Sequence, residues 1–139
     1  MSGEVEALRS LLRIGIHRDV EVTDGAGVSG PLVSQAFCSA LPVAYGRVTR
    51  SKWVGFATLV LEAAYEATLW AAVLNARRGT SATVLLTRVG GGAFGNDDAW
   101  IDAALRRALQ RARGFALGVR LLSFGRPPAS MLALARASA

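Results

Sequence analysis

Residues 82–124 constrain the fold most, because two short apolar runs flank a glycine-rich loop and an amphipathic helix. The first run, residues 82–89, has the continuous apolar character of a strand buried on both faces of a parallel sheet. The second run, residues 118–124, follows the helix. This order predicts a βαβ unit with parallel strands and a right-handed crossover. The helix is expected to bury one stripe, made of Ile101, Ala104, Leu105, Ala108 and Ala112.

The loop between the first run and the helix holds four glycines within six residues: Gly90, Gly91, Gly92 and Gly95. Glycine permits positive φ and a close approach of the backbone to a ligand. The free N–H groups at the start of the next helix carry a partial positive charge that favours an anion. In sheets of this kind, ligands bind beyond the carboxyl ends of the strands. The loop therefore predicts a diphosphate site; the alternative is a tight turn without a ligand.

The two best-known phosphate motifs do not fit this loop. A P-loop needs Gly-Lys-Ser/Thr at the helix start, whereas Gly95 is followed by Asn96 and Asp97. Gly90, Gly92 and Gly95 do have the Gly-x-Gly-x-x-Gly spacing of a dinucleotide fingerprint. However, residues 117–124 lack the acidic residue that this fingerprint places about twenty positions on. Asn96 or Asp97 is expected to cap the helix.

The rest of the chain predicts two more strands and a long helix. Residues 12–22 and 33–43 are the predicted strands. Residues 52–78 predict the helix, which Ser51 caps and Gly79 ends. Residues 129–139 predict a frayed helix or a tail. The expected buried side of the long helix comprises Phe56, Leu59, Val60, Ala63, Ala67 and Leu74.

Composition and length narrow the class of protein. With 139 residues, 52% hydrophobic and 19% charged, the chain predicts a single globular domain, residues 1–139, with its core over about residues 12–126. Cys38 and His17 are the single cysteine and histidine, so an internal disulfide and a zinc site are excluded. We expect no metal and no cofactor. Cys38 lies in an apolar run and is interpreted as a buried thiol, the alternative being a nucleophile.

Charge and hydropathy bear on partners and location. The net charge is +6, and a nucleic-acid surface on residues 100–113 is an alternative to a solvated helix face, the favoured interpretation. Glu62 and Glu66 interrupt the apolar stretch 53–74, so no membrane span is expected. The acidic start lacks a secretory pattern, which favours a cytoplasmic or nuclear site. Trp70 lies on a helix that is apolar nearly all round, so a covering segment or a homodimer is expected.

The stretch Gly91-Gly92-Ala93-Phe94-Gly95-Asn96-Asp97 resembles the diphosphate-binding loop of poly(ADP-ribose) glycohydrolases and, more generally, the second phosphate loop of macrodomains. The resemblance extends to residues 14–17, 21–23, 33–45, 61–68 and 119–125. These segments look like the C-terminal half of macrodomain-like proteins related to effector-type ADP-ribosyl-ubiquitin hydrolases. Together they span most of residues 12–126.

The resemblance implies a three-layer α/β/α fold with a mostly parallel or mixed sheet. It also implies binding of ADP-ribose and hydrolysis of the glycosidic bond between ribose and a modified protein. The ligand would be ADP-ribose or an ADP-ribosylated protein, with loop amides around the diphosphate and Phe94 against the distal ribose or the diphosphate. Asn96 would cap the helix or contact a ribose hydroxyl. The implied ligand-binding residues are Gly90, Gly91, Gly92, Ala93, Phe94, Gly95 and Asn96.

Macrodomains have more chain ahead of the first strand, including the adenine pocket and, in glycohydrolases, a glycine-rich catalytic loop with consecutive glutamates. Neither is present in this sequence. The chain is therefore expected to be truncated at its N-terminus, to pair with a second copy, or to be a degenerate relative. A non-catalytic module that binds ADP-ribose or a related nucleotide is the alternative to a hydrolase.

Hydrolysis of a ribosyl bond needs a carboxyl group at the scissile bond. Asp19, Glu21 and Asp24 lie at the end of the first predicted strand, at the sheet edge expected to face the ligand, and are the candidate catalytic residues. The alternative is three solvated charges in a turn. Glu62 and Glu66 share a helix face. They are interpreted as polar-face residues or as buried partners of an arginine such as Arg88.

Overall fold

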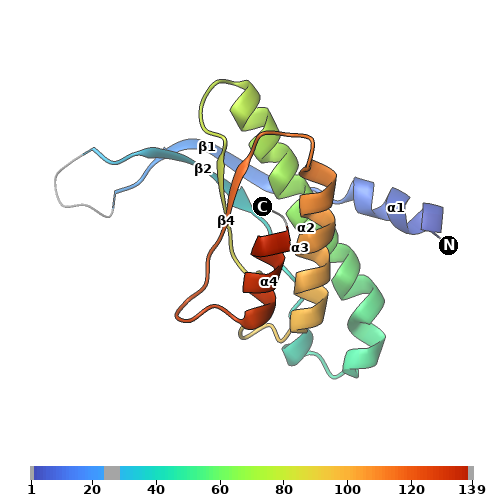
Figure 1. The fold of residues 1–139 in the computed structure, drawn as a ribbon. Coiled ribbons are helices and arrows are strands. Elements are labelled where there is room, and N and C mark those ends of the chain that lie inside the picture. The colour runs from blue at the N-terminus through green and yellow to red at the C-terminus, as the bar shows by residue number, and fades with distance from the viewer. Residues whose placement is uncertain (1, 24–28, 138–139) are drawn as a thin grey trace.

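The computed structural model describes residues 2–23 and 29–137. These form, in chain order, α1 (Ser2–Leu11), β1 (Gly15–Glu21), β2 (Leu32–Phe37), the 3-10 helix η1 (Val43–Tyr45), α2 (Arg50–Arg77), β3 (Thr83–Leu86), α3 (Asp98–Ala112), β4 (Gly118–Leu121) and α4 (Ala129–Ala137). Helices α2 and α3 pack side by side, and the β1–β2 hairpin extends away from them (Figure 1). The predicted α/β class is confirmed.

Strands β3 and β4 are parallel, with Val84 opposite Val119, and α3 lies between them in the chain. The predicted order of strand, loop, helix and parallel strand is thus confirmed. The prediction that the first of these strands is buried on both faces is wrong. In β3 buried and exposed residues alternate, and Leu85 is 57% exposed. One face packs on the helices and the other lacks cover from the described residues.

Strands β1 and β2 form an antiparallel hairpin whose register is irregular between His17 and Val20. At this irregularity Asp19 has a φ of +54°, which places a non-glycine residue in the left-handed region. Asp19 and Glu21 therefore do not follow the simple alternation expected of an extended strand. In the described residues the hairpin and the β3–β4 pair are separate two-stranded sheets. The three-layer sandwich is accordingly not confirmed.

The long helix lies where the sequence predicts it, but its buried face and its cap differ from expectation. Thr49 is the N-cap and makes no side-chain cap bond, while Ser51 lies inside the helix. Phe56 and Leu74 are about half exposed. A helix with apolar residues on most sides carries little periodic signal, so the partners it meets decide which face is buried. The residues buried in the fold are Ala57, Leu61, Ala63, Ala64, Tyr65, Leu69 and Val73.

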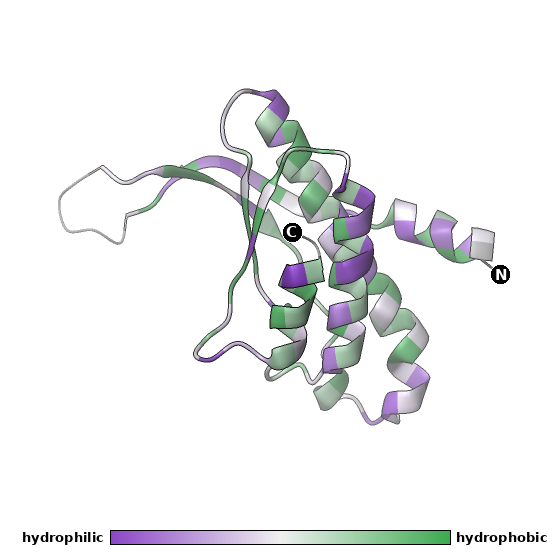
Figure 2. Cartoon of the chain, in the orientation of Figure 1, coloured by the Kyte–Doolittle hydropathy of each residue, from purple (hydrophilic) through white to green (hydrophobic). Residues whose placement is uncertain are grey.

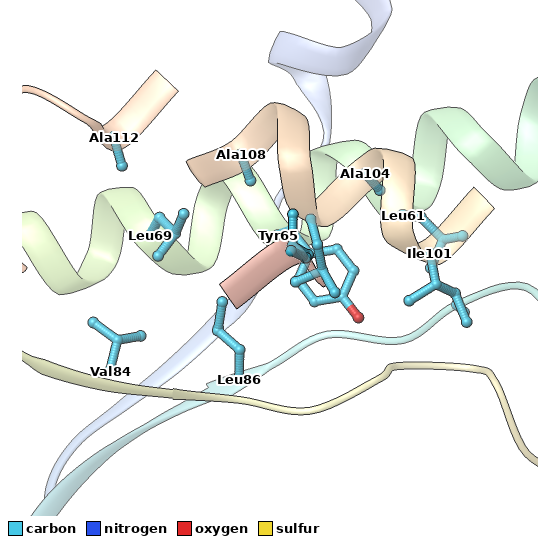
Figure 3. Packing of buried hydrophobic residues seen from close by; sticks show 12 residues of the cluster. Leu61, Tyr65, Leu69, Val84, Leu86, Ile101, Ala104, Ala108 and Ala112 are labelled. Carbon is cyan, nitrogen blue, oxygen red and sulfur yellow. The ribbon is translucent and has the colours of Figure 1, made fainter. Parts of the chain in front are cut away.

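The core lies between α2, α3 and one face of β3 (Figure 3). Leu61 and Leu69 of α2 meet Val84 of β3 and Ile101 of α3 in one cluster. All five residues of the predicted α3 stripe are buried. Figure 2 shows hydrophilic and hydrophobic residues alternating around the turns of α1 and α3, as in amphipathic helices. The cluster runs as far as Leu134, so α4 extends the core beyond the expected limit of residue 126.

Helix α1 has no counterpart among the predicted elements. Its Arg9 is 9% exposed and donates from Nε to Glu62 of α2 at 2.8 Å. Glu6 on the same helix pairs with Arg107 of α3 at 2.8 Å and also with Arg111. These ion pairs fasten α1 to both central helices. Two arginines of α3, Arg107 and Arg111, are thereby engaged in ion pairs within the chain.

Helix α2 is long and apolar enough, by length and composition, to cross a membrane, a property that core helices of soluble proteins share. Its two carboxylates are paired: Glu62 with Arg9, and Glu66 with Arg107 at 2.7 Å. The predictions of no membrane span and of a cytoplasmic or nuclear site stay predictions. The same holds for the homodimer. Trp70 is 41% exposed and packs edge-on against Phe115 with ring centroids 5.3 Å apart.

Candidate functional site

The glycine loop folds tightly over the segment that precedes α2. Gly90 and Gly95 have φ values of +78° and +67°, which favour glycine. A Cβ at Gly90 would lie 2.3 Å from the Cβ of Ala40, and one at Gly95 would lie 2.8 Å from the Cβ of Ala44. These two glycines are therefore required by backbone conformation and by close packing. Their presence alone is explained without a ligand.

Asn96 holds the loop closed from inside. It is 4% exposed, and its Nδ2 donates to the carbonyl oxygens of Leu41 at 2.8 Å and of Gly90 at 3.2 Å. Its backbone N–H donates to Gly90 at 3.0 Å. The helix cap is Asp97, whose carboxylate accepts from the N–H of Ala99 at 3.0 Å. Of the two predicted caps, Asp97 is thus confirmed, and Asn96 fixes the loop.

The amides of the loop fall into two groups. Gly91 donates to Arg88 at 3.4 Å and Gly95 donates to Gly92 at 3.0 Å, so these two amides are used within the turn. The N–H groups of Gly92, Ala93 and Phe94 donate to no residue in the described parts of the chain. A Cβ at Gly92 would meet nothing within 4 Å. The tip of the loop therefore offers three consecutive backbone donors, and the space beside Gly92 is open.

Basic and aromatic side chains surround this tip. Arg50, at the start of α2, donates to the carbonyl of Gly95 at 2.8 Å and lies 3.8 Å from the carboxylate of Asp97. Its guanidinium also lies over the ring of Trp100, 5.7 Å from the centroid. Phe94 meets Tyr45 edge-on at 6.1 Å. Arg50 was not among the predicted site residues; the basic cluster 47–52 just before an apolar helix is the signal that points to it.

Two acidic residues in the first part of α3 form ion pairs with Arg88. Arg88 pairs with Asp98 at 2.7 Å and also with Asp102. Burial lowers the pKa of Arg88, but its hydrogen bonds to Asp102 and Asp98 outweigh this effect and raise the pKa above its ordinary value. With Asp97 capping the helix, the first turn of α3 is already satisfied.

The two described candidate catalytic residues, Asp19 and Glu21, lie away from the loop. Asp19 pairs at 2.7 Å with Arg78, directly after the C-terminal end of α2, whereas Arg50 at the other end contacts the loop. At about 1.5 Å per residue, the 28 residues of α2 separate these ends by about 42 Å. Glu21 accepts from Ser29 Oγ at 2.7 Å and from Gly30 at 3.2 Å. Asp24 lies outside the described residues.

Glu62 and Glu66 are buried partners of arginines, as one of the two interpretations held, but Arg88 is not among them. Glu62 pairs with Arg9 and Glu66 with Arg107.

Cys38 is half-buried, and its Sγ lies 3.9 Å from Thr68 Oγ1. In the parts of the chain that the structure describes, no three His, Cys, Asp or Glu residues gather in a way that could hold a metal ion.

No family model, no curated protein and no solved structure matches this chain. A function for this chain therefore rests on the geometry of the loop and on the resemblance of residues 91–97 to the phosphate loops of macrodomains.

Proposed function

We propose that this chain binds ADP-ribose, with the diphosphate on the tip of the loop at residues 90–96. The observation that carries the proposal is the set of three consecutive amides, Gly92, Ala93 and Phe94, without an acceptor in the described residues. Backbone N–H groups that converge on one concave turn are a common anion site. The closed contacts of Asn96 and Gly90 hold the turn in shape before a ligand arrives, which reduces the entropic cost of binding.

Charge around the loop supports an anionic ligand. Arg50 is 57% exposed at its side chain and lies over the loop, so its guanidinium can turn to a phosphate oxygen. The nearest carboxylates are engaged: Asp97 caps α3, and Asp98 pairs with Arg88. Phe94, with Tyr45 beside it, offers an apolar surface to a ribose ring. The proposal includes the macrodomain-like three-layer fold, which the chain would adopt once its two-stranded sheets are parts of one complete sheet.

The geometry favours a binding module over a hydrolase. A carboxyl group must reach the scissile bond, and the described hairpin candidates, Asp19 and Glu21, lie toward the far end of α2 from the loop. Both also hold hydrogen-bond partners within the fold. Recognition of ADP-ribose without turnover is therefore the function that the arrangement supports best.

The test is calorimetric titration of the purified chain with ADP-ribose, ADP, NAD and inorganic diphosphate. Gly92→Glu is the disrupting variant, because a side chain there meets open space and would bring a negative charge to the amides. Gly92→Ala tests the added Cβ alone. Gly114→Glu is the matched control: its Cβ would also meet nothing within 4 Å, and it adds the same charge after the far end of α3.

Saturable binding of ADP-ribose that Gly92→Glu weakens at least tenfold, and that Gly92→Ala and Gly114→Glu preserve, is the expected result. No binding by the wild-type chain, or equal binding by all variants, would contradict the proposal. The contrary result is release of ADP-ribose from a modified protein by the wild type. If Glu21→Gln abolished that release and left the affinity unchanged, the chain would be a hydrolase and not a binding module.

A further inference from the structure

A groove of about 1000 Å³ lies between the hairpin and the β3–β4 pair. One wall is β2, from Leu32 to Ala36, and the other is β3, from Thr83 to Leu86. Small and polar residues of α2, Thr68, Ala71 and Asn75 among them, make the floor. Figure 1 shows the hairpin and β3 on the same side of α2.

Both walls are open strand edges. Among the described strands β2 pairs with β1 alone and β3 with β4 alone, so each has one row of N–H and C=O groups without a strand partner, and residues of both strands line the groove. These rows call for an occupant that has both donors and acceptors at the spacing of a strand. An extended polypeptide meets that requirement on both of its sides. Compact small molecules do not.

The hairpin and β3 also have uncovered apolar side chains. Leu32 and Leu85 are 66% and 57% exposed, and the described strands β1 and β2 carry no fully buried residue on either face. Hairpins on their own are marginally stable, and two-stranded parallel sheets are normally covered on both faces. The two sheets are therefore arranged like the outer strands of a wider sheet that lacks a central strand.

Size and charge select one kind of occupant. In a sheet, one strand residue takes about 160 Å³, from spacings of about 4.8 Å between strands, about 10 Å between layers and about 3.3 Å along the strand. The groove thus matches a strand of about six residues, close to the lengths of β2 and β3. Among the residues that the structure describes, the lining is uncharged apart from Arg18 and Asp19, and Asp19 is paired with Arg78. A charged segment would gain no partner there.

We propose that the groove binds one extended, uncharged, largely apolar segment of another polypeptide, which pairs with β2 and β3 and joins the two sheets into one. The segment's backbone bonds to both edges, and its alternate side chains rest on α2. This site is separate from the glycine loop. The proposed occupant is a peptide strand, and binding of a nucleotide or of a second copy of this chain in the groove would be an outcome against the proposal.

The test is selection of a phage-displayed library of random eight-residue peptides on the wild-type chain, followed by fluorescence anisotropy with the selected peptides. Ala36→Lys and Leu85→Lys place charges on the two walls at exposed positions, so the fold is preserved. Leu122→Lys is the matched control, since Leu122 is 42% exposed, follows β4 and does not line the groove. A copy of each peptide N-methylated at alternate residues removes donors from one edge.

The expected peptides alternate apolar residues and lack charge. Their affinity falls at least tenfold in Ala36→Lys, in Leu85→Lys and on N-methylation, and is unchanged in Leu122→Lys. Amide hydrogen exchange should slow in both β2 and β3 when the peptide binds. Failure to enrich any peptide over an Ala36→Lys/Leu85→Lys background, or protection of one strand alone, would overturn the proposal. So would displacement of the peptide by ADP-ribose, or a wild-type dimer that Leu85→Lys dissociates.

Discussion

The hydroxyl group of Tyr65 donates a hydrogen bond to the backbone carbonyl of Thr87 at 2.8 Å and accepts one from the N–H of Val89 at 2.9 Å. Tyr65 is 2% exposed in the middle of α2, and the two groups it bonds follow directly after β3 (Figure 3). One side chain thus fixes the path of the backbone from the strand into the glycine loop. The loop's position depends on the helix through this contact.

Replacing Tyr65 by Phe should therefore destabilise the protein by about 2 kcal/mol, because two partly buried backbone groups lose their partner. Urea denaturation at pH 7 measures the free energy of unfolding. Tyr45→Phe is the control, since Tyr45 is 68% exposed and its hydroxyl bonds to none of the described residues; a change within about 0.5 kcal/mol is expected there. Equal effects of the two substitutions would contradict the role given to Tyr65.

The stability of the protein should fall in alkaline solution through the same residue. Burial raises the pKa of Tyr65 from 10.0 to about 12. The folded state therefore keeps the proton over a range in which the unfolded state has lost it, so the contribution is complete below pH 10 and is lost as the pH rises from about 10 to about 12. The full change is about 2.7 kcal/mol, at about 1.4 kcal/mol per pKa unit. Denaturation curves of wild type and Tyr65→Phe across this range should converge; parallel curves would argue against the pKa shift.

Three of the four glycines of the loop, Gly90, Gly92 and Gly95, should respond differently to alanine. At Gly90 and Gly95 a methyl group meets Ala40 and Ala44 while φ is positive, so each substitution should cost about 2 kcal/mol or more. Gly92→Ala should change stability by less than about 0.5 kcal/mol, because open space surrounds that position. Thermal unfolding of the three variants makes the comparison. A destabilising Gly92→Ala would show that the loop tip is packed rather than open.

Arg9→Met should detach α1, because it leaves the Glu62 carboxylate, 16% exposed, without its main partner. Breaking a buried ion pair from one side costs about 3 kcal/mol. Limited proteolysis should then cut within residues 2–11 at protease levels that spare the wild type. Arg9→Met/Glu62→Met should recover most of the loss, since no charge is left buried. If the double variant is as sensitive as the single one, packing rather than charge holds α1.

The sequence predicts the buried face of an element only where polar and apolar residues lie on different sides of it. Helix α3 has a wide polar face, and its buried stripe was predicted in full. Helix α2 is apolar nearly all round, so its buried face was predicted only in part: Ala63 is buried as expected, but Phe56 is exposed and Leu61 is buried. Helix α1 is short and highly charged, and its Arg9 is buried by pairing with a residue 53 positions away, which no local pattern indicates.

The same distinction applies to the site. The place of the glycine loop and the cap at Asp97 follow from local spacing and were predicted. That Asp19 meets Arg78 while Arg50 meets Gly95 is a matter of tertiary arrangement along α2, which residue types alone do not reveal. The contact of Gly90 with Ala40 is equally long-range, and it explains part of the glycine content that local reasoning assigned to a ligand.

The hairpin is tied to α2 by two solvent-facing polar contacts, the Asp19–Arg78 pair and the 3.4 Å bond from Ser34 to Asn75. Exposed contacts of this kind contribute little free energy and weaken as salt rises. We therefore expect the hairpin to open locally at a low free-energy cost, while α2, α3 and β3 keep their packing. A protease or a chaperone that meets this protein under mild stress would encounter a loosened β1–β2 arm on an otherwise native body.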